Sequence, residues 1–198
     1  MAIPLARHVP VHSLILASAS PRRRILLRRL KMPFRIIPSH VSERTRETNP
    51  RRLVLKLALR KAKDVARRYP EAVVLGADTI VVCRREIIGK PKDHADALRI
   101  LDLLNGVWQE VYTGIAVVWA GGKVWRSHAV KSRVLARKLS PARLHRLAGK
   151  HHDKAGAYAV QDRNDPFISR IEGDYTNVVG LPLEATRSLL KEFRGHLT

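Results

Sequence analysis

The chain has 198 residues, 45% of them hydrophobic, which is enough to bury a full core in one domain or in one domain with two lobes. It carries 38 Lys and Arg against 17 Asp and Glu, a formal net charge of +21. So basic a balance favours polyanionic partners such as nucleic acid, an acidic membrane surface or phosphorylated small molecules, although solvated arginine-rich helices would give the same charge. No run of about 18 apolar residues, no signal-peptide pattern and a single cysteine, Cys83, exclude a membrane span and an internal disulfide and lead us to expect a cytoplasmic protein.

The first half of the chain alternates short apolar runs with helical patterns. Residues 14–17 predict a buried strand, and the Ser-Pro pair at 20–21 supplies a helix N-cap and a first helical residue. Residues 34–38 predict a second strand, and the Asn-Pro pair at 49–50 opens a helix with apolar residues at helical spacing. The nearly continuous apolar run at 72–82 predicts a strand that is covered on both faces.

The second half continues this alternation. We expect a helix over 93–104, a hairpin of strands over 111–119 and 124–135, a helix from 140–141 to about 147, a strand at 158–160 and a closing helix over 182–193. Strands that alternate with helices predict an α/β fold with a mixed sheet flanked by helices.

A phosphate site is indicated at the first strand-to-helix junction, where Ser18, Ser20, Arg22 and Arg23 meet. A helix start offers free N–H groups and the positive end of the helix dipole, and hydroxyl and guanidinium groups add donors. Arginine in a first turn opposes the dipole, so its presence there favours a bound anion. An ordinary capped helix with a solvated basic face is the alternative.

Asp78 is a carboxylate inside the most apolar strand, where burial is costly unless the charge is paired or bound to metal. We expect it to bind a divalent cation, Mg²⁺ or Mn²⁺, together with phosphate oxygens, to act as general base for a water, or to do both. A strand-end aspartate that caps a turn would look the same. Lys90, in a loop before a helix, could hold a departing phosphate, whereas Glu43 and Lys61 are by themselves typical of a surface.

The segment from His151 to Gln161 brings charged and small residues together. Its His-His-Asp cluster lacks further ligands at zinc spacing, so we do not expect zinc there. Lys154, with small residues after it, fits a loop that approaches a ligand, and Gln161 has the donor and acceptor needed to read a base edge.

These patterns together resemble the Maf family of nucleoside triphosphate pyrophosphatases. The resemblance runs from about residue 13 to 190 and rests on ordered motifs at 14–23, 76–79, 89–91, 112–114, 153–158 with Gln161, and 173–183. It implies one Maf-like α/β/α domain over 1–198, with two lobes around a central cleft and residues 1–12 as a disordered extension. It also implies hydrolysis of nucleoside triphosphates to monophosphate and pyrophosphate with a divalent metal. Members are often homodimers, clear unwanted nucleotides and have a link to cell-division arrest. Gln109 departs from the family pattern, in which histidine is common at this position.

The resemblance also implies roles for single residues. Asp78 matches the proton acceptor, and Glu43 matches an acidic metal-site position. Ser18, Arg22, Arg23, Lys61 and Lys90 match phosphate-contacting positions, and Arg22, Thr79 and Gln161 match positions that set substrate preference.

The motif at 153–158 followed by Gln161 resembles members that act on dTTP and UTP rather than 7-methyl-GTP. We therefore expect a pyrimidine triphosphate as substrate, modified forms included. The rival hypotheses are a division regulator that acts by binding, and a nucleic-acid-binding module. Against the latter, aromatic residues are 5% of the chain and no RNA-binding fingerprint is present.

Overall fold

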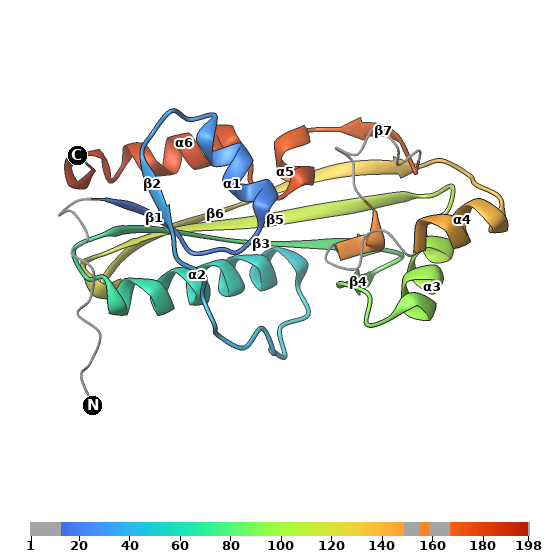
Figure 1. Cartoon of the computed structure of the whole chain (residues 1–198), viewed down its shortest axis with the longest axis horizontal. Coiled ribbons are helices and arrows are strands. Elements are labelled where there is room, and N and C mark those ends of the chain that lie inside the picture. The colour runs from blue at the N-terminus through green and yellow to red at the C-terminus, as the bar shows by residue number, and fades with distance from the viewer. Residues whose placement is uncertain (1–12, 149–154, 159–166, 198) are drawn as a thin grey trace.

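A mixed seven-stranded sheet organises the molecule (Figure 1). The computed structural model describes residues 13–148, 155–158 and 167–197. The strands are β1 (Leu14–Leu16), β2 (Phe34–Ile36), β3 (Val73–Cys83), β4 (Glu86–Ile88), β5 (Trp108–Trp119), β6 (Val124–Ala136) and β7 (Ile168–Glu172). Their order is β2-β1-β3-β5-β6-β7, with β4 paired to β3. Strand β1 runs parallel to β2 and β3, and the other pairs are antiparallel.

Helices cover both faces of the sheet. They are α1 (Pro21–Arg28), α2 (Pro50–Arg68), α3 (His94–Leu104), α4 (Pro141–Ala148), α5 (Tyr175–Val179) and α6 (Leu183–Lys191). Alternation along β1 shows how the layers form, because successive strand side chains point to opposite faces. Leu14 and Leu16 pack in a core with residues of α1 and α6, whereas Ile15 packs with residues of α2. Figure 1 shows α2 on one side of the sheet and α1, α5 and α6 on the other.

A further core lies at the end of the long strands where α3 and α4 pack (Figure 1). It contains Leu101, Leu144, Tyr158 and the fully buried Phe167. The cores under α1 and α2 lie along the other half of the same strands. Strand β3 contributes to both halves, so the side chains near its middle lie between two packed regions.

Helix α2 approaches the sheet closely because two facing strand positions are glycine. A Cβ at Gly76 would lie 2.3 Å from the carbonyl oxygen of Ala58, and one at Gly114 would lie 2.4 Å from the carbonyl group of Val54. Both distances are far below van der Waals contact. These two glycines therefore allow the backbone of α2 to rest directly on β3 and β5, and this places the side chains of α2 above the middle of the sheet.

The predicted fold class and most of its predicted elements are confirmed. The strand predicted at 158–160 is wrong at Tyr158, which follows a short 3₁₀ turn over Ala155–Ala157; residues 159 and 160 lie outside the described residues. Tyr158 packs against Phe167, with 5.6 Å between ring centroids, and so fills the core rather than extending the sheet. Ser20 does precede helix α1, but its side chain accepts no capping hydrogen bond. Among the described residues, no helix combines the length and apolarity of a bilayer span.

Candidate active site

A cleft of about 740 Å³ opens beside the middle of β3. Its walls come from the β1–α1 junction, the loop between β2 and α2, helix α2, strand β3, strand β4 with the loop after it, strand β5, Tyr158 and the end of α5. Nine of the predicted site residues line it: Ser18, Ser20, Arg22, Arg23, Glu43, Lys61, Asp78, Thr79 and Lys90. The fold thus gathers residues that are far apart in the sequence around one space.

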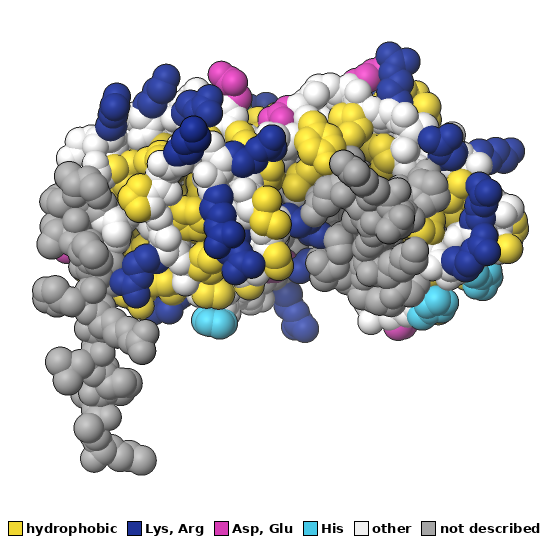
Figure 2. Space-filling view, turned by 45° about the horizontal axis from the view of Figure 1, so that its top comes forward, with side chains coloured by type: hydrophobic (Ala, Val, Ile, Leu, Met, Phe, Trp, Pro, Cys, Tyr) yellow, Lys and Arg dark blue, Asp and Glu magenta, His cyan; other side chains and the backbone are white. Residues whose placement is uncertain are grey.

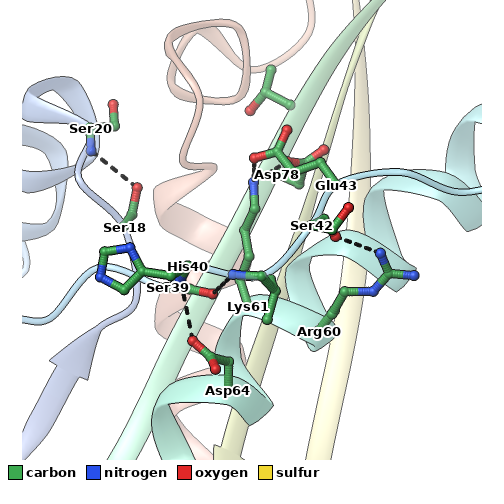
Figure 3. Close-up of polar contacts among 12 residues, drawn as sticks. Ser18, Ser20, Ser39, His40, Ser42, Glu43, Arg60, Lys61, Asp64 and Asp78 are labelled. Atoms are coloured by element: carbon green, nitrogen blue, oxygen red, sulfur yellow. Dashed lines mark hydrogen bonds and ion pairs between the residues drawn. The ribbon is translucent and has the colours of Figure 1, made fainter.

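Asp78, Lys61 and Glu43 form the charged centre of the cleft (Figure 3). The Lys61 ammonium projects from α2 and donates to Asp78 Oδ1 at 2.6 Å. The same nitrogen lies 2.7 Å from Glu43 Oε1, in the loop between β2 and α2. The side chain of Asp78 is 7% exposed and that of Glu43 is 56% exposed. One buried ammonium therefore joins a buried carboxylate of the sheet to a more open carboxylate of the loop.

The two carboxylates have opposite pKa shifts. Burial raises the pKa of Asp78 above the usual aspartate range, although the charges of Lys61 and Arg23 oppose this effect. Burial acts in the same direction on Glu43, but its hydrogen bond with Lys61 and the charges of Lys61, Lys90 and Arg23 outweigh burial and lower its pKa. A carboxylate with a raised pKa accepts a proton more readily, so Asp78 is the better general base of the pair.

Arg23 and Ser18 form a cationic corner at the start of α1. The Arg23 guanidinium donates from Nη1 to Ser18 Oγ at 3.3 Å, from Nη2 to Thr79 Oγ1 at 3.1 Å and from Nε to the Gly180 carbonyl at 2.9 Å. Ser18 Oγ also accepts from the Ser20 N–H at 3.2 Å. Both of these contacts use the serine oxygen as acceptor, so the hydroxyl proton of Ser18 remains available to an anion in the cleft.

The loop between β2 and α2, residues 37–49, is held against α2 by side chains one helical turn apart. Arg60 Nη1 donates to the Ser42 carbonyl at 2.6 Å, and the His40 N–H donates to Asp64 Oδ2 at 3.3 Å (Figure 3). Asn49 closes the loop by accepting a hydrogen bond from the backbone N–H of residue 52, which caps the helix. These contacts fix the part of the loop that carries Glu43.

The remaining predicted residues lie around this centre or beyond the described part of the chain. Arg22 and Thr79 line the cleft, and Lys90 is exposed at its edge, close enough for its charge to lower the pKa of Glu43. Lys154 and Gln161 lie outside the described residues.

Three groups next to the site received no individual role in the sequence analysis, although they lie within the motifs at 112–114 and 173–183. Gly180 supplies only a backbone carbonyl to Arg23, which no side-chain pattern could reveal. Thr113 and Asn177 are fully buried polar residues that continue the hydrogen bonds of Thr79 away from the cleft. A polar residue in a buried strand was the available signal for Thr113, but its partner Asn177 lies in helix α5, far away in sequence.

One family model and several known proteins match most of this chain. The model of the family described as Maf-like protein matches residues 13–193. A dTTP/UTP pyrophosphatase of Elusimicrobium minutum is 51% identical over 180 residues, covering 91% of this chain and 98% of the relative. A dTTP/UTP pyrophosphatase of Moorella thermoacetica is 48% identical, covering 91% and 94%.

Among solved structures, a nucleoside-triphosphatase/dITP/XTP pyrophosphatase of Mycobacterium abscessus matches 92% of this chain and 96% of its own, at 14% identity and a TM-score of 0.44. That likeness is too distant to bear on the function. The family match and the identities to the two bacterial relatives do not depend on it. The chain belongs to the Maf family.

Proposed function

We propose that this protein hydrolyses nucleoside triphosphates between the α and β phosphates, with dTTP and UTP as its preferred substrates. The names of the relatives, dTTP/UTP pyrophosphatase, support the reaction and the substrate. The observation that carries the proposal is the buried carboxylate of Asp78 in a cleft with cationic groups on two sides, Lys61 at 2.6 Å and the Arg23 corner. A base next to cations suits attack of water on a polyphosphate.

The reaction can be assigned to these residues step by step. Ser18, Arg22 and Arg23 hold the triphosphate at the start of α1, where the helix dipole adds positive charge. Asp78 accepts a proton from the water whose oxygen forms a new bond to the α-phosphorus. The bond from that phosphorus to the bridging oxygen breaks, and its electron pair leaves with pyrophosphate.

Two lysines neutralise the charge that develops on the departing pyrophosphate. Lys61 lies at the base and Lys90 at the edge of the cleft, so they approach the polyphosphate from different sides. Fixed positive charges of this kind lower the barrier without reorganisation during the reaction.

A divalent cation fits the carboxylates of this cleft. Glu43 and Asp78 both contact the Lys61 ammonium, so their carboxylates lie close enough together to share a cation. Mg²⁺ or Mn²⁺ would be held by these two carboxylates and would complete its ligands with phosphate oxygens and water. When bound, the cation would supply positive charge to the phosphates.

We further propose that Arg22, Thr79 and Gln161 set substrate choice, as the family resemblance implies, and that Lys154 contacts the substrate. The chain would act in the cytoplasm as a single domain with a central cleft, as a homodimer. The residue assignments rest on the resemblance of the motifs at 14–23, 76–79 and 153–161.

The net charge of +21 keeps nucleic-acid binding as a second candidate. Figure 2 shows Lys and Arg side chains scattered over the described part of the face that it presents, with few acidic ones among them. Binding of this kind would weaken steeply with salt, because it releases counterions. Retention of a labelled oligonucleotide at physiological salt would favour this candidate.

The test is a comparison of purified wild type with Asp78→Asn on each common triphosphate in the presence of Mg²⁺. Wild type should release nucleoside monophosphate and pyrophosphate, fastest from dTTP or UTP. The variant should lose roughly 10²–10⁴-fold in kcat while it still binds a non-hydrolysable dTTP analogue, because a general base contributes about that much. Nucleoside diphosphate with free phosphate as products, or full turnover by Asp78→Asn, would contradict the proposal.

A further inference from the structure

A line of buried hydroxyl groups leads away from the cleft, starting at Arg23. Arg23 Nη2 donates to Thr79 Oγ1 at 3.1 Å, and Thr79 Oγ1 lies 2.9 Å from Thr113 Oγ1. Thr113 Oγ1 in turn donates to the backbone carbonyl of Asn177 at 3.0 Å. Thr113 and Asn177 have no exposed surface, and Thr113 is not among the described residues that line the cleft. Thr113 therefore cannot contact a substrate directly.

The two ends of this line fix the direction of each hydrogen bond. A carbonyl only accepts, so the single hydroxyl proton of Thr113 is used on Asn177. Thr113 can then only accept from Thr79, so the proton of Thr79 points to Thr113. This leaves the lone pairs of Thr79 facing Arg23, whose guanidinium only donates. If Thr113 had no hydroxyl, Thr79 would lose the partner that holds its proton away from Arg23.

Asn177, at the end of the line away from the cleft, is held by several hydrogen bonds. Asn177 Nδ2 donates to the Val111 carbonyl at 3.1 Å and to Ser132 Oγ at 2.9 Å. Ser132 Oγ donates to the Asp174 carbonyl at 3.0 Å. The Asn177 carbonyl that Thr113 requires is thus tied to β5, to β6 and to the segment that precedes α5. Because the Asn177 carbonyl is held in place, the Thr113 hydroxyl keeps one orientation and in turn keeps the Thr79 hydroxyl in one orientation.

We propose that Thr113 is a positioning residue for polyphosphate binding, which acts by orienting Thr79 and through it the Arg23 guanidinium. The inference rests on the proposed function, because it assumes that Arg23 binds a phosphate of the substrate. Arg23 also donates to Ser18 and Gly180. If Thr79 turns away, the Arg23 guanidinium therefore loses one of three hydrogen bonds and is held less firmly, but it stays in the cleft. A phosphate contact that is present in both ground state and transition state affects KM more than kcat.

The experiment compares Thr113→Val with Thr113→Ser. Valine has the shape of threonine without the hydroxyl, and serine keeps the hydroxyl without the methyl group. For Thr113→Val we expect KM for dTTP and Kd for inorganic pyrophosphate, measured by calorimetry, to rise roughly 10-fold with kcat changed by less than about 3-fold. Thr113→Ser should return both KM and Kd to within about 2-fold of wild type.

A second comparison tests whether Thr113 acts through Arg23. If it does, Thr113→Val added to Arg23→Lys should raise the Kd for pyrophosphate by no more than about 2-fold over Arg23→Lys alone, because coupled residues are not additive. If Thr113→Val does not fold, Thr113→Ala provides the same loss of the hydroxyl without a branched side chain.

Each result has a defined meaning. An unchanged KM and Kd in Thr113→Val, or an equal loss in Thr113→Ser at equal thermal stability, would overturn the inference and leave Thr113 a packing residue. Failure of wild type to turn over any triphosphate would instead overturn the proposed function. The pyrophosphate affinities of the two variants would still test the positioning role in that case, because binding requires no turnover.

Discussion

Replacement of Lys61 by methionine tests the charged centre of the cleft most sharply. Methionine keeps much of the apolar stem but removes the ammonium that lies 2.6 Å from Asp78 and 2.7 Å from Glu43. Glu43 is half exposed and can turn to water, whereas the Asp78 side chain is 7% exposed and would be left as a buried charge. Removing one partner of a buried ion pair costs about 3–5 kcal/mol. The charge of Arg23 still acts on Asp78, so we expect the lower end, about 3 kcal/mol.

For a chain of this length, 3 kcal/mol corresponds to a fall in Tm of roughly 6–12 °C. The assay is thermal unfolding of the free protein at constant pH, with Lys56→Met as control, since Lys56 is an exposed residue of the same helix. The double variant Lys61→Met, Asp78→Asn should recover most of the loss, because a neutral amide requires no counter-charge. A Tm for Lys61→Met within about 2 °C of the Lys56→Met value would mean that the Lys61 ammonium does not stabilise the buried Asp78 carboxylate.

Three further predictions follow from packing, from an unpaired amide and from one pKa. Gly114→Ala should destabilise severely or prevent soluble expression, because the new Cβ would meet the α2 backbone at 2.4 Å; Gly195→Ala, with nothing within 4 Å, is the control for urea unfolding. Gln109→Leu should raise the free energy of unfolding by about 1–2 kcal/mol, because neither end of the buried Gln109 amide has a partner among the described residues and leucine removes this unpaired polar group. A free energy of unfolding below that of wild type would contradict this prediction. Burial and the hydrogen bond to Glu110 raise the pKa of Tyr112 to about 12. Folding stability should therefore be lost as the pH rises from about 10 to 12, and Tyr112→Phe should reduce that loss in unfolding experiments and remove a step near pH 12 from a tyrosinate titration.

The sequence alone predicted the site residues that are unusual for their local structure. Asp78 was recognisable because a carboxylate inside an apolar strand is costly to bury unless it is paired or bound to a metal. The arginines after Pro21 were recognisable because their charge opposes the helix dipole. The structure places these residues in one cleft. Glu43 and Lys61 carried no signal of their own, and only the resemblance to a family selected them. Their closeness depends on how the loop before α2 folds back, which local patterns do not determine.

The elements that were missed have equally specific causes. Strand β7 (Ile168–Glu172) is polar and partly exposed along its length, so its pattern lacks the apolar alternation of a half-buried strand. Residues around Tyr158 looked like a strand because they are apolar and aromatic, but Gly156 and Ala157 have positive φ values of 78° and 58° and turn the chain. Asn177 could not be predicted as a partner of Thr113, since 64 residues separate them.

Hydrolysis of dTTP in ¹⁸O-labelled water with Mg²⁺ shows which phosphorus the water attacks. We expect the products to be dTMP and pyrophosphate with the label in dTMP, because the water aided by Asp78 attacks the α-phosphorus. Label in the pyrophosphate would mean attack at the β-phosphorus and a different placement of the triphosphate. Formation of dTDP and labelled phosphate would contradict cleavage between the α and β phosphates altogether.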